Sequence, residues 1–199
     1  MAGEEQAWRL VAEGDPDEVC ARAAVDHTVE RGYEVPVFGF PIFVEPQTRT
    51  FTPSGPETEF ILNKLAYLSR LSILHYLLTA QRLPPTGRLM APNEVRAGQF
   101  YSTGSHVLPL APIAARFSTD PAGFLAQAAR FGGRPCSFGD AAAELLPFPR
   151  VPMTLILWQE DEEFPARSSL LFDEVCEMQL PPDILWSTAM VATLLVLRG

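Results

Sequence analysis

Two long stretches of the chain are apolar on nearly every side, and both are predicted to form helices. In the first, residues 57–81, leucine, isoleucine and aromatic side chains occupy several faces of a helix. The second, residues 183–197, has no charged residue after Asp183. A helix that is hydrophobic all round is buried on more than one side. The pattern therefore predicts two core helices against which the other elements pack.

Between residues 32 and 52 the pattern changes to the two-residue period of a β-strand. Pro36, Pro41 and Pro46 interrupt this region. Proline cannot donate a ladder hydrogen bond, so in sheets it is confined to edge positions. We expect a three-stranded antiparallel meander here, with the prolines at edge positions.

A second β region lies towards the C-terminus. Met153–Trp158 is the most strand-like run in the sequence, and Ser169–Phe172 is predicted to be its hairpin partner. Residues 160–163, in the turn between them, form the densest acidic cluster of the chain. A further short strand is expected at residues 88–91.

Cap and turn residues predict several shorter helices. Asp15-Pro16 and Asp120-Pro121 each combine an N-cap residue with a proline at the first helical position. Gly132-Gly133 is predicted to end the second of these helices in a left-handed cap. Other short helices or helical turns are expected at residues 3–14, 97–101, 108–117 and 141–144, the last of them capped by Asp140.

Together these elements predict an α+β fold: an antiparallel sheet (N-terminal meander plus C-terminal hairpin) packed against two long apolar helices. At 199 residues the chain is expected to form a single domain, residues 1–199. A chain of this length buries enough surface to fold without disulfides or structural metals.

Charge narrows the partners that we expect. The chain has 24 acidic and 15 basic residues, a formal net charge of −9, and Lys64 as its one lysine. Such a surface repels nucleic acid and anionic lipid, so neither is expected to bind. The uncharged segment Ile184–Leu197 is also shorter than the ~20 residues of a membrane span.

The cysteines and the start of the chain indicate the compartment. Cys20, Cys136 and Cys176 are odd in number and no two form a C-x-x-C motif. Free thiols in a reducing cytosol are therefore expected, with no intrinsic iron–sulfur cluster. The first residues lack the basic start and apolar run of a signal peptide, which predicts a cytoplasmic protein.

The acidic cluster is the first candidate for chemistry. If the strand continued through it, Asp161 and Glu163 would share one face ~7 Å apart. Asp173 could then approach them across the hairpin. Carboxylates in this arrangement hold a divalent cation such as Mg²⁺ or Ca²⁺, or share a proton. The alternative is a solvated turn whose charges keep an edge strand from aggregating.

The histidines are further candidates. His75 and Lys64 fall on one stripe of the helix at residues 57–81, where they could line a pocket. The alternative is a structural role with buried polar partners. His106 follows a hydroxyl-rich loop, residues 101–105. His75, His106 and Glu163 are the candidate catalytic residues.

A glycine-bearing loop at residues 131–140 contains Arg134 and Asp140. Backbone amides together with Arg134 could hold an anion. A helix cap followed by a turn explains the glycines equally well. The candidate binding residues of the chain are thus Lys64, His75, Arg134 and Asp140.

Several motifs taken together resemble a known family. In chain order they are Asp15-Pro16, the strands of Tyr33–Val44, Ile73–Leu78, Gly87, Gly132-Gly133, Gly139-Asp140, Leu146-Pro147, Trp158–Pro165, Leu171–Asp173 and Leu180-Pro181. This set looks like the uncharacterised domain-of-unknown-function family DUF3786, found largely in anaerobic bacteria and archaea. The most specific part is the Asp-Glu-Glu-Phe-Pro run that begins at Asp161.

The resemblance has implications for metabolism but not for catalytic residues. Some relatives are fused to an iron–sulfur segment of the kind seen in corrinoid one-carbon proteins. This implies a role in anaerobic redox or methyl-transfer metabolism. The present chain lacks such cysteines, so any cluster would have to come from a partner. Relatives also tend to have a glycine before the acidic motif, where this chain has Gln159-Glu160.

Three functions follow from these observations. The first is an accessory module that binds a small-molecule ligand or a protein partner in a pocket between the helix at residues 57–81 and the sheet. The second is a metal-assisted or carboxylate acid–base enzyme that uses Asp161, Glu162 and Glu163, with a divalent cation as cofactor. The third is a structural subunit of a homo-oligomer such as a homodimer.

Overall fold

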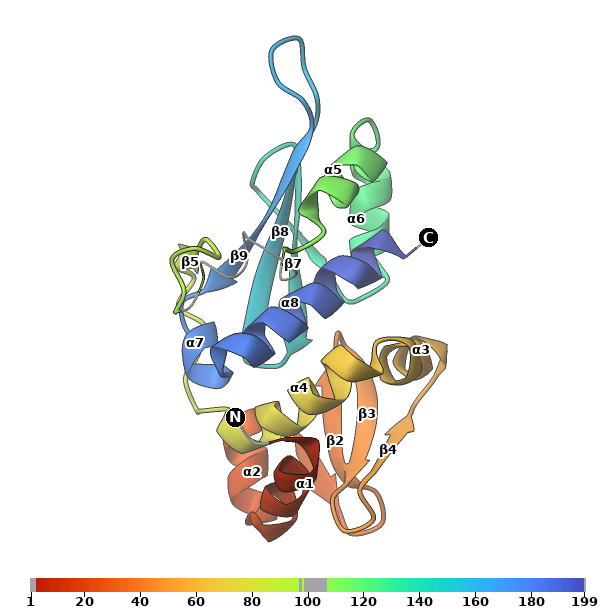
Figure 1. Ribbon diagram of the computed structural model, residues 1–199, viewed down its shortest axis with the longest axis vertical. Helices are drawn as coiled ribbons and strands as arrows, with labels where there is room; N and C mark the ends of the chain where they lie inside the picture. Colours follow the sequence, from red (N-terminus) through yellow and green to blue (C-terminus); the bar gives the residue numbers. More distant parts are fainter. Residues whose placement is uncertain (1–2, 97, 99–106, 199) are drawn as a thin grey trace.

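The computed structural model describes residues 3–96, 98 and 107–198 and arranges them around two antiparallel sheets (Figure 1). One sheet has the strand order β1-β2-β3-β4 and the other the order β5-β9-β8-β7-β6. The α+β class expected from the sequence is confirmed. The β-structure is more extensive than expected and is divided into two sheets.

The elements have the following bounds. The helices are α1 (Glu4–Glu13), α2 (Pro16–Ala23), α3 (Pro56–Lys64), α4 (Ala66–Thr79), α5 (Leu110–Phe117), α6 (Pro121–Ala129), α7 (Cys176–Gln179) and α8 (Pro182–Leu197). The strands are β1 (Asp26–Thr28), β2 (Gly32–Val37), β3 (Phe40–Glu45), β4 (Thr50–Pro53), β5 (Leu89–Met90), β6 (Arg134–Cys136), β7 (Ala141–Phe148), β8 (Val151–Trp158) and β9 (Arg167–Asp173).

The first sheet is the expected meander with one additional strand, β1. Its central pair turns at Phe38-Gly39, where both residues have a positive φ (51° and 81°), as a two-residue hairpin requires. Pro36 and Pro41 face each other in this pair, at positions that β1 and β4 do not reach. Both prolines therefore lie where no outer strand needs their missing N–H, as predicted.

The short helices at the N-terminus are confirmed. Asp15 caps α2, because its Oδ1 accepts from the backbone N–H groups of Asp17 and Glu18. Arg22, near the end of α2, donates to the carbonyls of Leu77, Leu78 and Ala80 at the C-terminal end of α4. A cation at this position satisfies carbonyls that the helix itself leaves without partners. The contact fixes α2 against α4.

The prediction of one continuous helix at residues 57–81 is wrong. The region forms two helices, α3 and α4, which meet at a break at Leu65 (φ −110°, ψ 21°). The hydroxyl of Ser69 donates to the carbonyl of Ile61, and Nε of Arg70 donates to that of Leu62. These side chains replace the backbone N–H donors that an unbroken helix would supply there. Leu65 is thus the corner between two helices.

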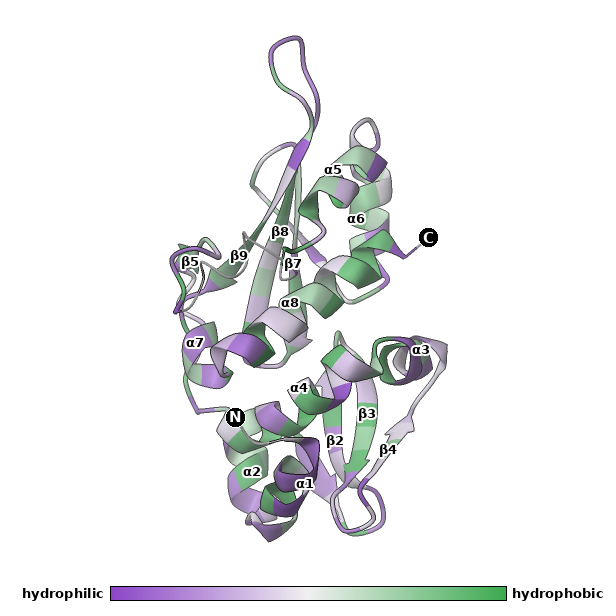
Figure 2. Cartoon of the chain, in the orientation of Figure 1, coloured by the Kyte–Doolittle hydropathy of each residue, from purple (hydrophilic) through white to green (hydrophobic). Residues whose placement is uncertain are grey.

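The second sheet contains the predicted hairpin of β8 and β9 at its centre. Met153 pairs with Phe172 and Trp158 with Arg167, and β5 is the predicted short strand. Every residue of β8 from Val151 to Leu157 is buried. The hairpin extends beyond α5 and α6, and its tip is hydrophilic (Figures 1 and 2).

The prediction of a helix or turn at residues 141–144 is wrong. These residues begin β7, and Ala141, Ala142 and Ala143 are buried in register with β8. Alanine favours helices, but the gain from pairing and burying this segment against a hydrophobic strand exceeds that small preference. The strand β6, also absent from the prediction, pairs with β7 at the sheet edge.

The helices α4 and α8 pack against each other between the two sheets (Figure 1). Two of their buried hydroxyls bond within their own helix: Ser72 donates to the carbonyl of Leu68, and Thr188 to that of Ile184. Both helices therefore meet through surfaces whose polar groups are already satisfied. The two apolar stretches of the sequence form the centre of the molecule, as predicted.

Candidate functional site

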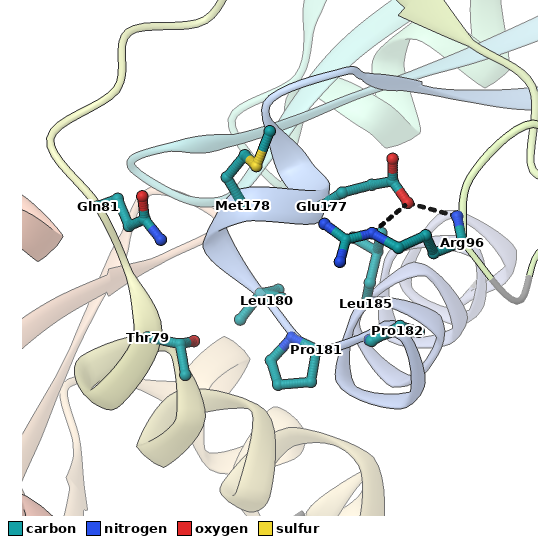
Figure 3. A pocket seen from close by; sticks show the side chains of 9 residues that line it. All are labelled: Thr79, Gln81, Arg96, Glu177, Met178, Leu180, Pro181, Pro182 and Leu185. Carbon is teal, nitrogen blue, oxygen red and sulfur yellow. Dashed lines mark hydrogen bonds and ion pairs between the residues drawn. The ribbon is translucent and has the colours of Figure 1, made fainter.

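A cavity lies where the end of α4, the short helix α7 and the start of α8 meet (Figure 3). We call it the α7 pocket. It has a volume of about 210 Å³, and sites for drug-sized ligands span ~300–1,000 Å³. The α7 pocket is thus of a size for a small metabolite. It lies at the junction of the N-terminal and C-terminal halves of the chain, since α4 lines a small cavity together with Val37 of the first sheet, and α7 contacts β8 of the second.

Most of the wall of the α7 pocket is apolar. The side chains that form this part are Met178, Leu180, Pro181, Pro182 and Leu185. The two prolines form the corner between α7 and α8, where their fixed φ angles limit backbone motion. Leu180 and Leu185 are buried, which holds the base of the pocket in place, whereas Met178 is about half exposed. An apolar group of a ligand would be enclosed by these side chains.

Four polar residues complete the α7 pocket. Thr79 and Gln81 approach from the end of α4, and Arg96 and Glu177 from the opposite side (Figure 3). Nε of Arg96 lies 3.7 Å from Oε1 of Glu177, and the backbone N–H of Arg96 donates to the same oxygen. The Arg96 side chain is 71% exposed and that of Glu177 18%. The α7 pocket therefore combines one ion pair, Arg96–Glu177, with a largely apolar base.

The two sides of the α7 pocket are joined through Gln179. Its carbonyl accepts from the hydroxyl of Thr79 at 2.7 Å, and its Oε1 accepts from the backbone N–H of Gln81 at 2.8 Å. Gln179 is completely buried, so these bonds are shielded from water. They tie α7 to the end of α4 and fix the width of the pocket.

Asp173, at the end of β9, determines where α7 begins. Its carboxylate is buried and accepts from the backbone N–H groups of Thr86, Gly87 and Val175 and from the hydroxyl of Thr86. The bond to Gly87 is 2.7 Å long and that to Val175 is 3.0 Å. A buried carboxylate is tolerated when donors surround it in this way. Asp173 thus holds both the segment before β5 and the turn into α7.

Cys176, the first residue of α7, is a buried anchor rather than an exposed thiol. Its Sγ donates to the carbonyl of Pro152 at 3.3 Å. Burial, and next the negative charge of Asp173, raise the pKa of this thiol well above its ordinary 9.0. The protonated form is therefore the stable one, and the thiol acts as a small apolar group with a weak donor.

The predicted acidic cluster lies in the turn between β8 and β9, away from the α7 pocket. Asp161 uses Oδ1 to accept from the backbone N–H groups of Glu163 and Phe164, at 2.8 and 2.7 Å. These bonds lower the pKa of its carboxyl below the ordinary 3.8. Residues 160–163 are all exposed. The strand does not continue through them, so the alternation expected for Asp161 and Glu163 is absent.

The structure does not bring Asp173 to that turn. Trp158 and Arg167 form the last pair before the turn, whereas Asp173 pairs with Leu89 at the other end of β9. Asp161 and Glu163 are therefore separated from Asp173 by the length of the strand. Among the residues that the structure describes, no group of three or more histidine, cysteine or acidic side chains is arranged to hold a metal ion.

His75 and Lys64, expected on one stripe of a long helix, are separated by the break at Leu65. His75 is buried on α4, and its carbonyl accepts from the hydroxyl of Thr79. Lys64 is exposed at the end of α3. Neither lines the α7 pocket. His106 and the loop at residues 101–105 lie outside the described residues, as does most of the helical turn expected at 97–101.

The glycine-bearing loop at residues 131–140 forms a helix cap followed by a turn, which is the second of the two alternatives considered from the sequence. Gly132 has a φ of +70° and ends α6 in the predicted left-handed cap. Arg134 is exposed on β6, and Oδ2 of Asp140 accepts from the backbone N–H of Gln159 at 2.8 Å. Asp140 thus supports the base of the β8–β9 hairpin and does not join Arg134 in one site.

The residues that line the α7 pocket were not singled out from the sequence. Arg96 and Glu177 are 81 residues apart and belong to no motif. Pro181-Pro182 before an apolar helix was the local sign of a rigid corner there. Which side chains meet at that corner depends on the packing of α4 against α8, which no local pattern reports.

An α+β chain with two antiparallel sheets and a small pocket at their junction is the class of protein that this geometry defines. The chain belongs to the family described as Domain of unknown function (DUF3786), whose model matches residues 15–194. No match was found among the curated proteins or among the solved structures. Within the described part of the chain, no helix has both the length and the apolar character needed to cross a membrane.

Proposed function

We propose that this protein is a binding module that takes a small molecule in the α7 pocket. The observation that supports this most directly is the composition of the pocket wall, in which an apolar base faces a few convergent polar groups. This combination is typical of small-molecule sites. The pocket is also built from both halves of the chain, so a ligand there would contact α4, α7 and α8 together.

The proposal includes the metabolic setting implied by the family resemblance. In that setting the protein is an accessory module in anaerobic redox or one-carbon metabolism, and it acts through its bound ligand or through a partner. The bonds between Gln179 and the end of α4 support such a role, because they make the pocket a fixed receptor. Preorganised receptors lose less conformational entropy on binding.

A fragment screen by ¹⁵N-resolved NMR tests the binding proposal. Small organic fragments at millimolar concentration are expected to shift the backbone amides of Gln81, Arg96 and Glu177. The variant Gln81→Trp fills the pocket entrance from an exposed position and should abolish these shifts. Arg82→Trp is the matched control, because Arg82 is also exposed and does not line the pocket. If no fragment shifts these amides, or if binding is unaffected by Gln81→Trp, the proposal is wrong.

A further inference from the structure

The position of Arg96 indicates the chemical class of the ligand, which the size of the pocket alone does not. One oxygen of Glu177 holds this arginine at two points, its backbone N–H and Nε. The guanidinium group is therefore held by the part nearest the main chain. Figure 3 shows its two terminal nitrogens pointing away from the main chain of Arg96, past the carboxylate of Glu177 and towards the side of the α7 pocket formed by Met178 and Leu180.

Among the described residues, nothing competes with a ligand for these terminal nitrogens. Each carries two N–H donors, and the structure shows no partner for them among the described residues. The Arg96 side chain is 71% exposed, so a molecule entering from solvent can reach it. A guanidinium fork matches a carboxylate with two parallel hydrogen bonds, which an amide or an alcohol cannot reproduce.

The second charge of the α7 pocket favours the same ligand. An amine would have to compete with Arg96 for Glu177, whose side chain is only 18% exposed, accepts from the backbone N–H of Arg96 and forms an ion pair with its guanidinium group. A carboxylate instead meets the open side of the guanidinium and leaves this ion pair intact. Apart from the uncharged Thr79 and Gln81, the remainder of the wall is apolar, and it offers no second cation among its described residues.

We infer that the ligand of the α7 pocket is a small monocarboxylate with a short apolar body. Its carboxylate lies on the terminal nitrogens of Arg96, and its hydrocarbon part on Leu180, Pro181 and Leu185. This inference rests on the proposed function and adds the chemical class of the ligand. In it Arg96 is the binding residue, and Glu177 is a positioning residue that holds the guanidinium in place.

Three probes of one shape test the inference: 4-methylpentanoate, 4-methylpentanamide and 4-methylpentan-1-amine, each titrated into the intact protein by NMR. The acid is expected to bind ~10-fold more tightly than the amide, as charge-assisted bidentate bonds allow. The amine should bind more weakly than either. If the amide or the amine binds as tightly as the acid, the inference is overturned while the binding module stands. If none of the three shifts the pocket amides, both are overturned.

Variants separate binding through Arg96 from a general effect of charge. Arg96→Gln should remove the preference of the pocket for the acid over the amide, and the control Arg82→Gln, which removes the same charge from an exposed position outside the pocket, should preserve it. Glu177→Gln keeps the acceptor for Arg96 and removes a negative charge, so affinity for the acid should be retained or increased. Loss of acid binding in Glu177→Gln, or equal loss in both arginine variants, would contradict the assigned roles.

Discussion

The two ends of β9 place the same kind of side chain in opposite environments. Beyond its first residue, Arg167, the hairpin turn exposes the carboxylates of residues 160–163 to water. At its last residue, Asp173, a single carboxylate is buried among backbone donors. The first end stands out in the sequence as a run of four acidic residues, whereas the second has only the pair Asp173-Glu174.

This contrast shows that the density of carboxylates is a poor guide to their structural importance. In the turn, water solvates most of the charge, and the hydrogen bonds of Asp161 organise only the two residues after it. At the other end, Asp173 positions the segment before β5 and the start of α7, and so one wall of the α7 pocket. A carboxylate has large effects where water is excluded and donors converge on it.

The largest expected effect is that of Asp173→Ala. The substitution removes the charged acceptor of the backbone N–H groups of Thr86, Gly87 and Val175, and a hydrogen bond to a charged group contributes about 1.5–3 kcal/mol. We expect the free energy of unfolding, measured with urea, to fall by about 3–5 kcal/mol. Asp161→Ala serves as the control at the other end of the strand. If both variants lose the same free energy of unfolding, the proposed difference between the two ends of β9 is wrong.

The next effect is the loss of stability at alkaline pH. Burial raises the pKa of the Cys176 thiol, so this group is protonated in the folded protein at pH values where the unfolded chain has lost the proton. The stabilisation is complete below about pH 9, the pKa of an unfolded thiol, and is lost as pH rises above it. Burial also raises the pKa of Tyr33 to about 12, which extends the decline above pH 10.

The variant Cys176→Ala measures how much of this alkaline loss of stability is caused by the Cys176 thiol, which lies close to Asp173 at the end of β9. Between pH 9 and 10 the free energy of unfolding should fall less steeply than in wild type, by up to about 1.4 kcal/mol per pH unit. Urea denaturation at each pH provides the comparison, and slopes rather than absolute stabilities are compared because alanine leaves a small cavity. Identical slopes in both proteins would show that the thiol does not contribute.

A smaller effect is expected from Asp161→Ala in the turn. Loss of the acceptor for Glu163 and Phe164 should accelerate hydrogen exchange at these two backbone amides and lower the free energy of unfolding only slightly, because water screens this exposed carboxylate. Binding of probes in the α7 pocket should not change, because the turn and the pocket lie at opposite ends of the hairpin. Unchanged amide exchange would show that the carboxylate does not organise the turn.

The smallest effect is expected when Glu160, Glu162 and Glu163 are all replaced by glutamine. These side chains are exposed, so the free energy of unfolding should change by no more than about 0.5 kcal/mol. Calorimetry with Mg²⁺ or Ca²⁺ on wild type and on this variant checks the alternative function of the cluster. Saturable cation binding that disappears in the variant would restore the turn as a metal site and reverse the comparison between the two ends.

Much of the fold could be predicted because its signals are local. Asp15-Pro16 and Gly132-Gly133 mark helix ends through cap geometry, and β8 and β9 follow from short runs of strand-forming residues. The break at Leu65 was missed because the donors that replace the helical bonds, Ser69 and Arg70, lie one turn further on. The alanines of β7 were assigned to a helix because only their neighbour in the sheet makes them a strand.

The candidate site was much less predictable. The sequence drew attention to Asp161 and Glu163, whose local density is high, and to Asp173 as their partner. The structure places Asp173 at the far end of the strand, and the α7 pocket uses Arg96 and Glu177 instead. A pocket is formed by residues from distant segments, so its members share no spacing that a sequence pattern could reveal.

The sequence by itself determined the α+β class, the two apolar helical regions at the centre and the main hairpin, because hydrophobic periodicity and cap residues act over a few neighbouring positions. The tertiary structure alone decided that Asp173 is buried, that Arg96 meets Glu177 and that α4 and α7 enclose a pocket. These outcomes depend on which surfaces exclude water when distant segments pack, and water exclusion determines the energetic weight of a charge or a hydrogen bond.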